Sequence, residues 1–502
     1  MKVVTAKQMR EIDQAVYAHY HMPSVLLMEH AALAIFTHLK KVVQTIIEPK
    51  FLIVCGNGNN GGDGFAVARL LTQASYRVHV FCTSNPDELA GDARMHYQMA
   101  KAYGVNFMQS LENINQYDVV VDCIFGTGFY GEMPLNIAQV IDTMNHDAKY
   151  IVAVDVPSGL VYGAKDIIIA HETVTLALPK QFLLTDFAAD YVGQLTVLDI
   201  GIPQALLTQI ETDTFTVEVQ DVQLQKRHRN VNKGSFGKIL ILAGSKGLTG
   251  AAILSANACI RGGAGLVTVG IAASQQPIIA NQLTECMTVP LNEELGALSY
   301  ASLPQIQSLL KGADALLIGP GLSFTNEIEM LICAILADIH IPVIMDADGL
   351  NVLSKHIDSI KTCQSPFIIT PHPGEMARLI HKDIAYVQAN RLEVAREFAR
   401  EHAVTCVLKG VHTLTALPDG RVFVNTSGNA GMASGGMGDV LAGLIAAFVS
   451  QGYAVQDAVY LHGLAADLAT QTQGEISLVA TDVIKYLPQA IQNATNAYKN
   501  LD

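Results

Sequence analysis

Short apolar runs alternate with longer amphipathic stretches along most of the chain. Residues 5–45 carry apolar side chains at helical spacing and predict two helices. From residue 51 the runs become β-type, rich in Val, Ile, Leu and Phe, with enough chain between them for crossover helices. This alternation predicts a largely parallel sheet with helices on both faces. We expect its strands at Phe51–Cys55, Arg77–Cys82, Asp118–Ile124, Tyr150–Val154, Thr173–Leu178 and Gln194–Ile200.

A polar segment, Thr212–Asn232, interrupts this rhythm, and we interpret it as a connection between two domains. The domains are expected at residues 1–215 and 222–502. Because a second α/β series follows the connection, the predicted fold class is α/β, with two three-layer αβα domains. The second set of strands is expected at Ile239–Ala243, Leu266–Ile271, Ala315–Ile318, Pro342–Met345, Pro366–Thr370, Thr405–Leu408, Thr413–Ala416 and Arg421–Val424.

Composition narrows the range of functions. A chain of 502 residues, half of them apolar, is too long for one ordinary core. The net charge of −14 argues against binding to nucleic acid or to an anionic membrane, which requires clustered Lys and Arg. The eight cysteines lack zinc-site or disulfide spacing, and the first residues lack the apolar core of a signal peptide. We expect a soluble cytoplasmic protein.

A glycine-rich segment, Gly56–Gly64, follows the first predicted strand. It contains the dinucleotide pattern G-x-G-x-x-G, but the next strand ends in Phe81–Ser84 without the acidic residue that would hold a ribose. This weakens the ordinary Rossmann interpretation. Asn59, Asn60 and Asp63 make the segment rich in oxygen acceptors, which suits a cation beside a ligand. A structural Asx-rich turn is the alternative.

Two carboxylates, Asp122 and Asp155, end neighbouring buried strands. At such a position they would repel each other unless a cation or a proton lay between them. Satisfaction by local backbone amides is the structural alternative. Each carboxylate is followed by a Gly-containing turn, Gly126–Gly128 or Pro157–Gly159.

The segment Gly428–Gly443 runs from a glycine-rich turn into the apolar helical stretch Val440–Val449. Free N–H groups and the helix dipole at such a junction can hold an anion. Asp439 lies at the junction, where its carboxylate would repel a resting phosphate, so it would act on a partner of the phosphate. A simple helix cap is the alternative.

The second half resembles the dehydratase domain of NAD(P)H-hydrate repair enzymes. The resemblance is carried by Lys233–Lys238, Thr249–Ala252, Gly263–Thr268, Thr370–Leu379 and Gly428–Gly443. It implies a ribokinase-like fold, whose Gly-x-Gly-Asp turn is Gly436–Asp439 here. The family often has Ser or Thr where this chain has Met437, which implies that backbone N–H groups hold the anion.

The first half resembles NAD(P)H-hydrate epimerase, with a Rossmann-like fold. The matches are Leu27–Glu29, Gly56–Gly64, Asp122, Gly126–Gly128, Asp155–Leu160 and Asp199–Pro203. His30 stands where the family usually has Asn, so the contact made by that Asn is in doubt. Together the two resemblances cover nearly the whole chain.

The dehydratase resemblance implies a substrate, NADH or NADPH hydrated at C6 of the nicotinamide ring, whose S form is restored while ADP gives AMP and phosphate. We interpret Asp439 as the base that takes the hydroxyl proton. The implied substrate contacts are Gly265, Gly321, His372, Pro373, Gly374, Glu375, Met376, Ala377, Arg378 and Asp439. The implied ADP contacts are Lys409, Gly410, Val411, His412, Thr413, Asn429, Ala430, Gly431, Met432, Ala433, Ser434, Gly435, Gly436, Met437 and Gly438. Mg²⁺ is expected with the nucleotide.

The epimerase resemblance implies interconversion of the R and S hydrates, with Asp155 acting on the C6 hydroxyl. It places potassium near Asn60, Asp122 and Ser158. The implied dinucleotide contacts are Asn59, Asn60, Gly61, Gly62, Asp63, Gly126, Thr127, Gly128, Phe129, Tyr130, Gly131, Glu132 and Asp155.

Two other functions share some of these features. A ribokinase-type small-molecule kinase would have the Asp439 turn but would not explain the Asn59–Asn60 pair or His372–Glu375. A non-catalytic nucleotide sensor would not need both sets of carboxylates. The residues leave ADP against ATP and NADH against NADPH open, although the resemblance favours ADP and a homo-oligomer.

Overall fold

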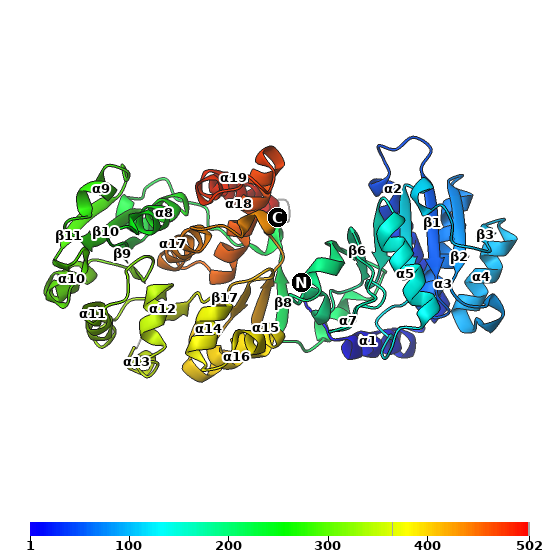
Figure 1. Cartoon of the computed structure of the whole chain (residues 1–502), viewed down its shortest axis with the longest axis horizontal. Coiled ribbons are helices and arrows are strands. Elements are labelled where there is room, and N and C mark those ends of the chain that lie inside the picture. The colour runs from blue at the N-terminus through cyan, green and yellow to red at the C-terminus, as the bar shows by residue number, and fades with distance from the viewer. Residues whose placement is uncertain (364, 500–502) are drawn as a thin grey trace. The chain divides into compact units, whose positions relative to one another are not determined.

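The computed structural model describes residues 1–363 and 365–499, and its chain forms two compact units (Figure 1). The N-terminal unit is Lys2–Thr212, and the C-terminal unit comprises Met1 and the chain from Asp213 onward. The first domain therefore ends slightly before residue 215. The expected connection begins with a strand, β8 (Thr214–Val217), which belongs to the second sheet. Thr214 and Thr216 make this edge strand half polar, so its sequence resembles that of a linker.

The N-terminal unit is built on a seven-stranded sheet in the order β3-β2-β1-β4-β5-β6-β7. Every neighbouring pair is parallel, as the sequence predicts. The six expected strands are present, and β3 is an additional short one. The bounds are β1 Lys50–Cys55, β2 Arg77–Cys82, β3 Asn106–Met108, β4 Val119–Cys123, β5 Ile151–Val154, β6 Glu172–Leu176 and β7 Gln194–Leu198.

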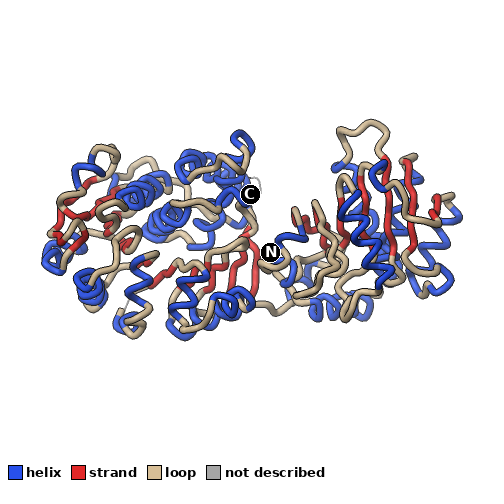
Figure 2. Tube along the Cα trace, viewed as in Figure 1, coloured by secondary structure: helices blue, strands red, loops and turns tan. Residues whose placement is uncertain are grey.

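Alternating side chains of these strands build a core on each face of the sheet. On β1, Phe51, Ile53 and Cys55 join one core, whereas Leu52 and Val54 join the other. Because a strand turns successive side chains to opposite faces, helices must cover both. Figure 2 shows this layering in each unit. The helices are α1 Ala6–Tyr20, α2 Ser24–Val42, α3 Asn59–Gln73, α4 Gly91–Ala102, α5 Leu135–Asp147, α6 Ala189–Val192 and α7 Gln204–Gln209.

Helix α3 begins at Asn59, within the segment expected to be a loop. A side chain at Gly61 would place its Cβ 2.1 Å from the carbonyl oxygen of Gly56, and one at Gly64 would place it 2.7 Å from Cys55 Sγ. These glycines therefore let the helix lie directly on the sheet. Glycine is unfavourable inside a helix by about 1 kcal/mol, which is why the run looked like a turn.

The C-terminal unit contains a ten-stranded sheet in the order β11-β10-β9-β14-β15-β16-β17-β18-β19-β8. In this sheet order, each neighbouring pair from β11 across to β17 is parallel, and β18 is antiparallel to both of its neighbours. All the expected strands are present within a residue or two. The bounds are β9 Lys238–Leu242, β10 Leu266–Ala272, β11 Met287–Leu291, β14 Ala315–Ile318, β15 Val343–Met345, β16 Phe367–Ile369, β17 Thr405–Leu408, β18 Leu414–Ala416 and β19 Val422–Asn425, with a separate hairpin of β12 Glu293–Glu294 and β13 Ala297–Leu298.

Helices α8, α17, α18 and α19 pack over one face of this sheet around the buried side chains of Ile239, Ile241 and Ala243. Helix α16 packs against β17 and β18. The helix bounds are α8 Thr249–Arg261, α9 Gln276–Ala280, α10 Leu303–Leu310, α11 Asn326–Leu336, α12 Asp348–Leu353, α13 Ser359–Thr362, α14 Pro373–Leu379, α15 Ile384–Ala389, α16 Arg391–His402, α17 Met437–Ser450, α18 Val455–Gln473 and α19 Ala480–Lys499. The prediction of two αβα domains is confirmed.

Within the described ranges, no single helix is long and apolar enough to cross a membrane. Helices α1 and α2 meet the length and composition requirement only as a pair, with a bend of 120° between them.

Candidate functional sites

The carboxyl ends of neighbouring parallel strands bring the chemistry-bearing residues of the C-terminal unit to one edge of its sheet. Asp346 follows β15, His372 and Glu375 follow β16, and Lys409 follows β17. Gly321 follows β14 and packs on the start of α8, where an added Cβ would lie 2.9 Å from the carbonyl oxygen of Leu248. This edge is the C-terminal candidate site.

The turn before α17 supplies free backbone donors to this site. Helix α17 begins at Met437, three residues before the expected helical stretch, and its first internal hydrogen bond runs from Val440 N–H to the Gly436 carbonyl. Gly436 has φ 91°, and an added Cβ would lie 2.6 Å from Leu254 Cδ1, so glycine is required there. The N–H groups of residues 436–439 have no partner inside the helix and can hold an anion.

Asp439 lies in the first turn of α17 but does not cap it, because the N-cap is Gly436 and no side-chain cap hydrogen bond forms. Burial raises the pKa of Asp439 to about 6, the charge of Asp346 adds to the shift, and Lys409 opposes it. The Met437 side chain is buried in the core, so this residue offers the site only its backbone. The helix-cap alternative is therefore wrong.

Lys409 is paired with carboxylates rather than solvated. Its Nζ lies 2.8 Å from Asp346 Oδ1 and 3.9 Å from Glu375 Oε2. Burial lowers the pKa of Lys409, but the two carboxylates outweigh it and the net direction is upward. His372 caps α14, where its Nδ1 accepts from the Gly374 and Glu375 N–H groups. Burial lowers the pKa of His372, as do the charges of Lys409 and Arg378.

Two residues that the sequence did not single out hold the expected nucleotide segments in place. Arg391 donates to the carbonyls of Leu408 and His412, and these hydrogen bonds help to fix the position of residues 409–413. Asp467 accepts from the Gly428 N–H at 2.8 Å and from Asn429 Nδ2 at 2.9 Å. Neither has a motif of its own, since Arg391 begins α16 and Asp467 lies within α18.

One expected substrate contact, Gly265, is not brought to this site. It immediately precedes β10 and therefore lies at the amino edge of the sheet, opposite the strand ends described above. Its N–H donates to the carbonyl of Phe236, and an added Cβ would lie 1.7 Å from the Lys233 carbonyl oxygen. Close backbone packing accounts for the glycine.

In the N-terminal unit, Asp122 near the end of β4 and Ser158 after β5 form a buried pair. Ser158 Oγ donates to Asp122 Oδ1 at 2.6 Å, and the N–H groups of Ser158 and Ile124 donate to the same carboxylate. Burial raises the pKa of Asp122 to about 6 despite these bonds. Local amides thus satisfy Asp122, as the structural alternative held.

Asn60 lies beside this pair in the first turn of α3. Its Nδ2 donates to the carbonyls of Phe125 and Val154, and the Phe125 N–H donates to Ser158 Oγ. Asn60 Oδ1 is buried and has no hydrogen-bond partner within residues 1–363 and 365–499. No group of three or more His, Cys, Asp or Glu side chains in those ranges is arranged to hold a metal ion.

Asp155 has a cation partner that the sequence analysis missed. Lys180 Nζ donates to Asp155 Oδ1 at 2.6 Å, and also to Thr175 Oγ1 and the Leu176 carbonyl. The Lys180 side chain is 1% exposed, so the pair is desolvated. Asp155 itself has φ 66°, a left-handed conformation that is rare outside glycine. The repulsion expected between Asp122 and Asp155 is thus relieved at Asp155 by an ammonium group.

The glycine-containing loop after β4 passes between Asn60 and Asp155. A Cβ on Gly126 would lie 3.5 Å from Asn60 Cβ and 3.6 Å from Asp155 Oδ2. The rings of Phe125 and Phe129 stack with their centroids 4.4 Å apart, whereas Tyr130 is 87% exposed.

Of the expected contacts in α3, Asn59 is exposed, and Asn60 to Asp63 are buried. Burial raises the pKa of Asp63 well above its usual range, with the charge of Asp155 adding to it.

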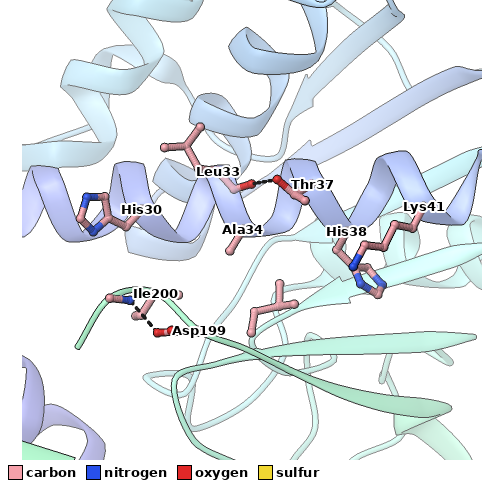
Figure 3. A pocket seen from close by; sticks show the side chains of 10 residues that line it. His30, Leu33, Ala34, Thr37, His38, Lys41, Asp199 and Ile200 are labelled. Atoms are coloured by element: carbon pink, nitrogen blue, oxygen red, sulfur yellow. Dashed lines mark hydrogen bonds between the residues drawn. The ribbon is translucent and has the colours of Figure 1, made fainter. Parts of the chain in front are cut away.

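A separate cavity of about 430 Å³ lies between α2 and the segment after β7 (Figure 3). His30, His38 and Lys41 on α2 face Asp199 and Ile200 across it. His30 contacts Gly201, since an added Cβ there would lie 3.0 Å from His30 Nδ1. The cavity lining does not include Asp122 or Asp155.

Comparison with known proteins follows the same division of the chain. Residues 239–489 match the family model described as NAD(P)H-hydrate dehydratase, and residues 24–182 match that of the YjeF-related protein N-terminus. A bifunctional NAD(P)H-hydrate repair enzyme of Moorella thermoacetica is 39% identical over 98% of this chain and 97% of its own. The chain belongs to the family of bifunctional NAD(P)H-hydrate repair enzymes.

Other members of this repair-enzyme family are similar over most of their length. The Escherichia coli (strain K12) enzyme is 34% identical over 90% of this chain and 87% of its own. A solved structure of a ribokinase-like superfamily protein from Enterococcus faecalis V583 is 28% identical, with a TM-score of 0.50, and covers 57% of this chain and 98% of that one. The predicted family, pair of activities and ribokinase-like fold are confirmed.

Proposed function

We propose that the N-terminal unit interconverts the R and S forms of hydrated NADH and NADPH, and that the C-terminal unit dehydrates the S form with ADP. The observation that carries the second activity is Asp439, a partly buried carboxylate in a helix turn whose first N–H groups have no partner among the described residues. A carboxylate there would not receive a resting phosphate. It is suited to take a proton from the hydroxyl that attacks the phosphate.

Dehydration then proceeds in two steps, phosphoryl transfer and elimination. The C6 hydroxyl oxygen bonds to the terminal phosphorus of ADP, the bond to the bridging oxygen breaks, and AMP leaves with that electron pair while Asp439 takes the hydroxyl proton. The C6–oxygen bond next breaks and phosphate departs with its electrons. The neighbouring ring carbon gives a proton to water, and the electron pair of that C–H bond restores the double bond. The free N–H groups of residues 436–438 stabilise the charge on the transferred group.

We propose that Mg²⁺ enters this site with the nucleotide, bound mainly through its phosphates, because Mg²⁺ keeps several waters and seldom needs a cage of protein ligands. It would neutralise phosphate charge during transfer. Arg391 and Asp467 support the proposal indirectly, since they fix the two segments expected to hold ADP.

For epimerisation we propose that Asp155 assists loss of the C6 hydroxyl and its return on the other face. Its Oδ1 is held by Lys180, and its Oδ2 lies toward Gly126. The free N–H groups of the first turn of α3 offer a place for the dinucleotide phosphates. A potassium ion would fit the oxygens of Asn60, Asp122 and Ser158, because Asn60 Oδ1 has no partner in the part of the chain that the structure describes. It would supply positive charge beside Asp122.

The dehydration rate should depend on the ionisation of Asp439. Since the base must be deprotonated and its pKa is raised to about 6, the rate should level off above about pH 6. Below that pH it should fall, approaching about tenfold per pH unit. Initial rates of NADH recovery from hydrated NADH and ADP, measured between about pH 5 and 8, test this. A dehydration rate that stays constant down to about pH 5 would exclude Asp439 as the base.

A further inference from the structure

Asp346 has no part in the mechanism above, yet it is held unusually tightly at the site. Its side chain is 2% exposed at the end of β15. The next residue, Ala347, has φ 49° and ψ −117°, outside the regions that L-residues normally occupy. An added Cβ on Gly319 would lie 1.8 Å from the Asp346 carbonyl oxygen. Strained backbone of this kind persists where surrounding structure enforces it, and it often marks a functional position.

The partner of Asp346 is Lys409, and this lysine differs from the other buried lysine at a strand end. An ammonium group has three donors. Lys180 uses all three, on Asp155, Thr175 and Leu176. Within the described residues, Lys409 donates one hydrogen bond, to Asp346 Oδ1, and its side chain is 21% exposed. Lys409 therefore keeps donors for a further anionic partner.

That ammonium lies against the anion-holding turn. A Cβ on Gly438 would lie 3.4 Å from Lys409 Nζ and 3.7 Å from Asp346 Oδ2. Gly438 is the second residue of α17, so the ammonium sits beside the free N–H groups of residues 436–438. An anion at the helix N-terminus would meet the amides and the ammonium together.

We propose that Lys409 stabilises the transferred phosphoryl group, and that Asp346 is the positioning residue that holds the Lys409 ammonium beside it. This rests on the dehydration proposed above, in which phosphorus bonds to the C6 oxygen as its bond to AMP breaks. Negative charge on the phosphoryl oxygens meets a cation already in place. Lys409 thus contributes more to kcat than to the affinity for resting nucleotide.

Three variants test this: Lys409→Met, Asp346→Asn and the double variant. Lys409→Met should lower kcat for dehydration ~100- to 1,000-fold, as for loss of one preorganised donor, with a much smaller change in AMP affinity by calorimetry. Asp346→Asn should lower kcat ~100-fold, the cost of a misplaced group. The double variant should match Lys409→Met alone, because both changes remove one interaction. The double variant removes both charges of this ion pair, so its kcat can be measured even if Asp346→Asn folds poorly.

Asp348→Asn is the matched control. Asp348 begins α12 two residues after Asp346, but its carboxylate accepts from the Ser323 N–H and from Asn351, so kcat should be kept. Epimerase activity of each sample reports the amount of folded chain. The inference would be overturned if Lys409→Met weakened AMP binding but kept kcat. It would also be overturned if kcat of the double variant fell by the product of the two single-variant losses. If the wild-type chain itself does not dehydrate hydrated NADH with ADP, the proposed function fails instead.

Discussion

Asp439→Asn should nearly abolish recovery of NADH from its S hydrate while the R and S hydrates still interconvert. A base held within hydrogen-bond reach contributes ~100- to 10,000-fold, and an amide cannot accept the hydroxyl proton in its place. The measurement is the initial rate of NADH recovery with ADP, beside the rate of epimer interconversion in the same sample.

The substitution should leave the turn itself intact. Asn has the same size as Asp, and the contact that anchors this residue, from Ser255 Oγ to the Asp439 carbonyl at 3.0 Å, involves only its backbone. Unchanged epimerisation shows that the chain has folded. A variant that dehydrates at the normal rate would show that Asp439 is not the base.

Asp155→Asn should slow interconversion of the hydrates by ~100- to 10,000-fold without affecting dehydration of the S form. Asn is preferable to Ala because its side-chain oxygen can still accept from Lys180, which is buried. Ala would take from the buried ammonium this hydrogen bond as well as its counter-charge, which would destabilise the fold further and obscure the result.

Both activities can be seen in one progress curve. With an R and S mixture and excess ADP, wild type should convert all of the hydrate, whereas Asp155→Asn should stop rapid conversion when the S fraction is exhausted. Complete conversion by the variant at the wild-type rate would exclude Asp155 as the epimerisation residue.

The sequence predicted the fold well because parallel strands buried on both faces are continuous apolar runs. It placed β14 and β17 with their observed bounds. It failed at β8, where Thr214 and Thr216 hide a strand, and at α3, where glycines that permit close packing imitate a loop. Both failures concern residues whose type is set by distant neighbours.

The candidate sites were predicted where a motif carries the chemistry and missed where a lone side chain completes it. Asp155 and Asp439 stand in recognisable turns. Lys180, the partner of Asp155, and Asp346, the partner of Lys409, come from other segments and are placed only by the fold. Gly265 shows the converse error, since a glycine in a family motif served backbone packing rather than the ligand.

We infer that one chain performs both steps of repair at the expense of nucleotide. The most direct test mixes the protein with hydrated NADH, with ADP, with ATP or without nucleotide, and follows the absorbance of reduced nicotinamide. We expect complete recovery from both epimers with ADP, one AMP and one phosphate per NADH, and no recovery without nucleotide. Nucleotide consumed without recovery, as by a kinase, or neither change, as for a non-catalytic nucleotide sensor, would contradict this expectation.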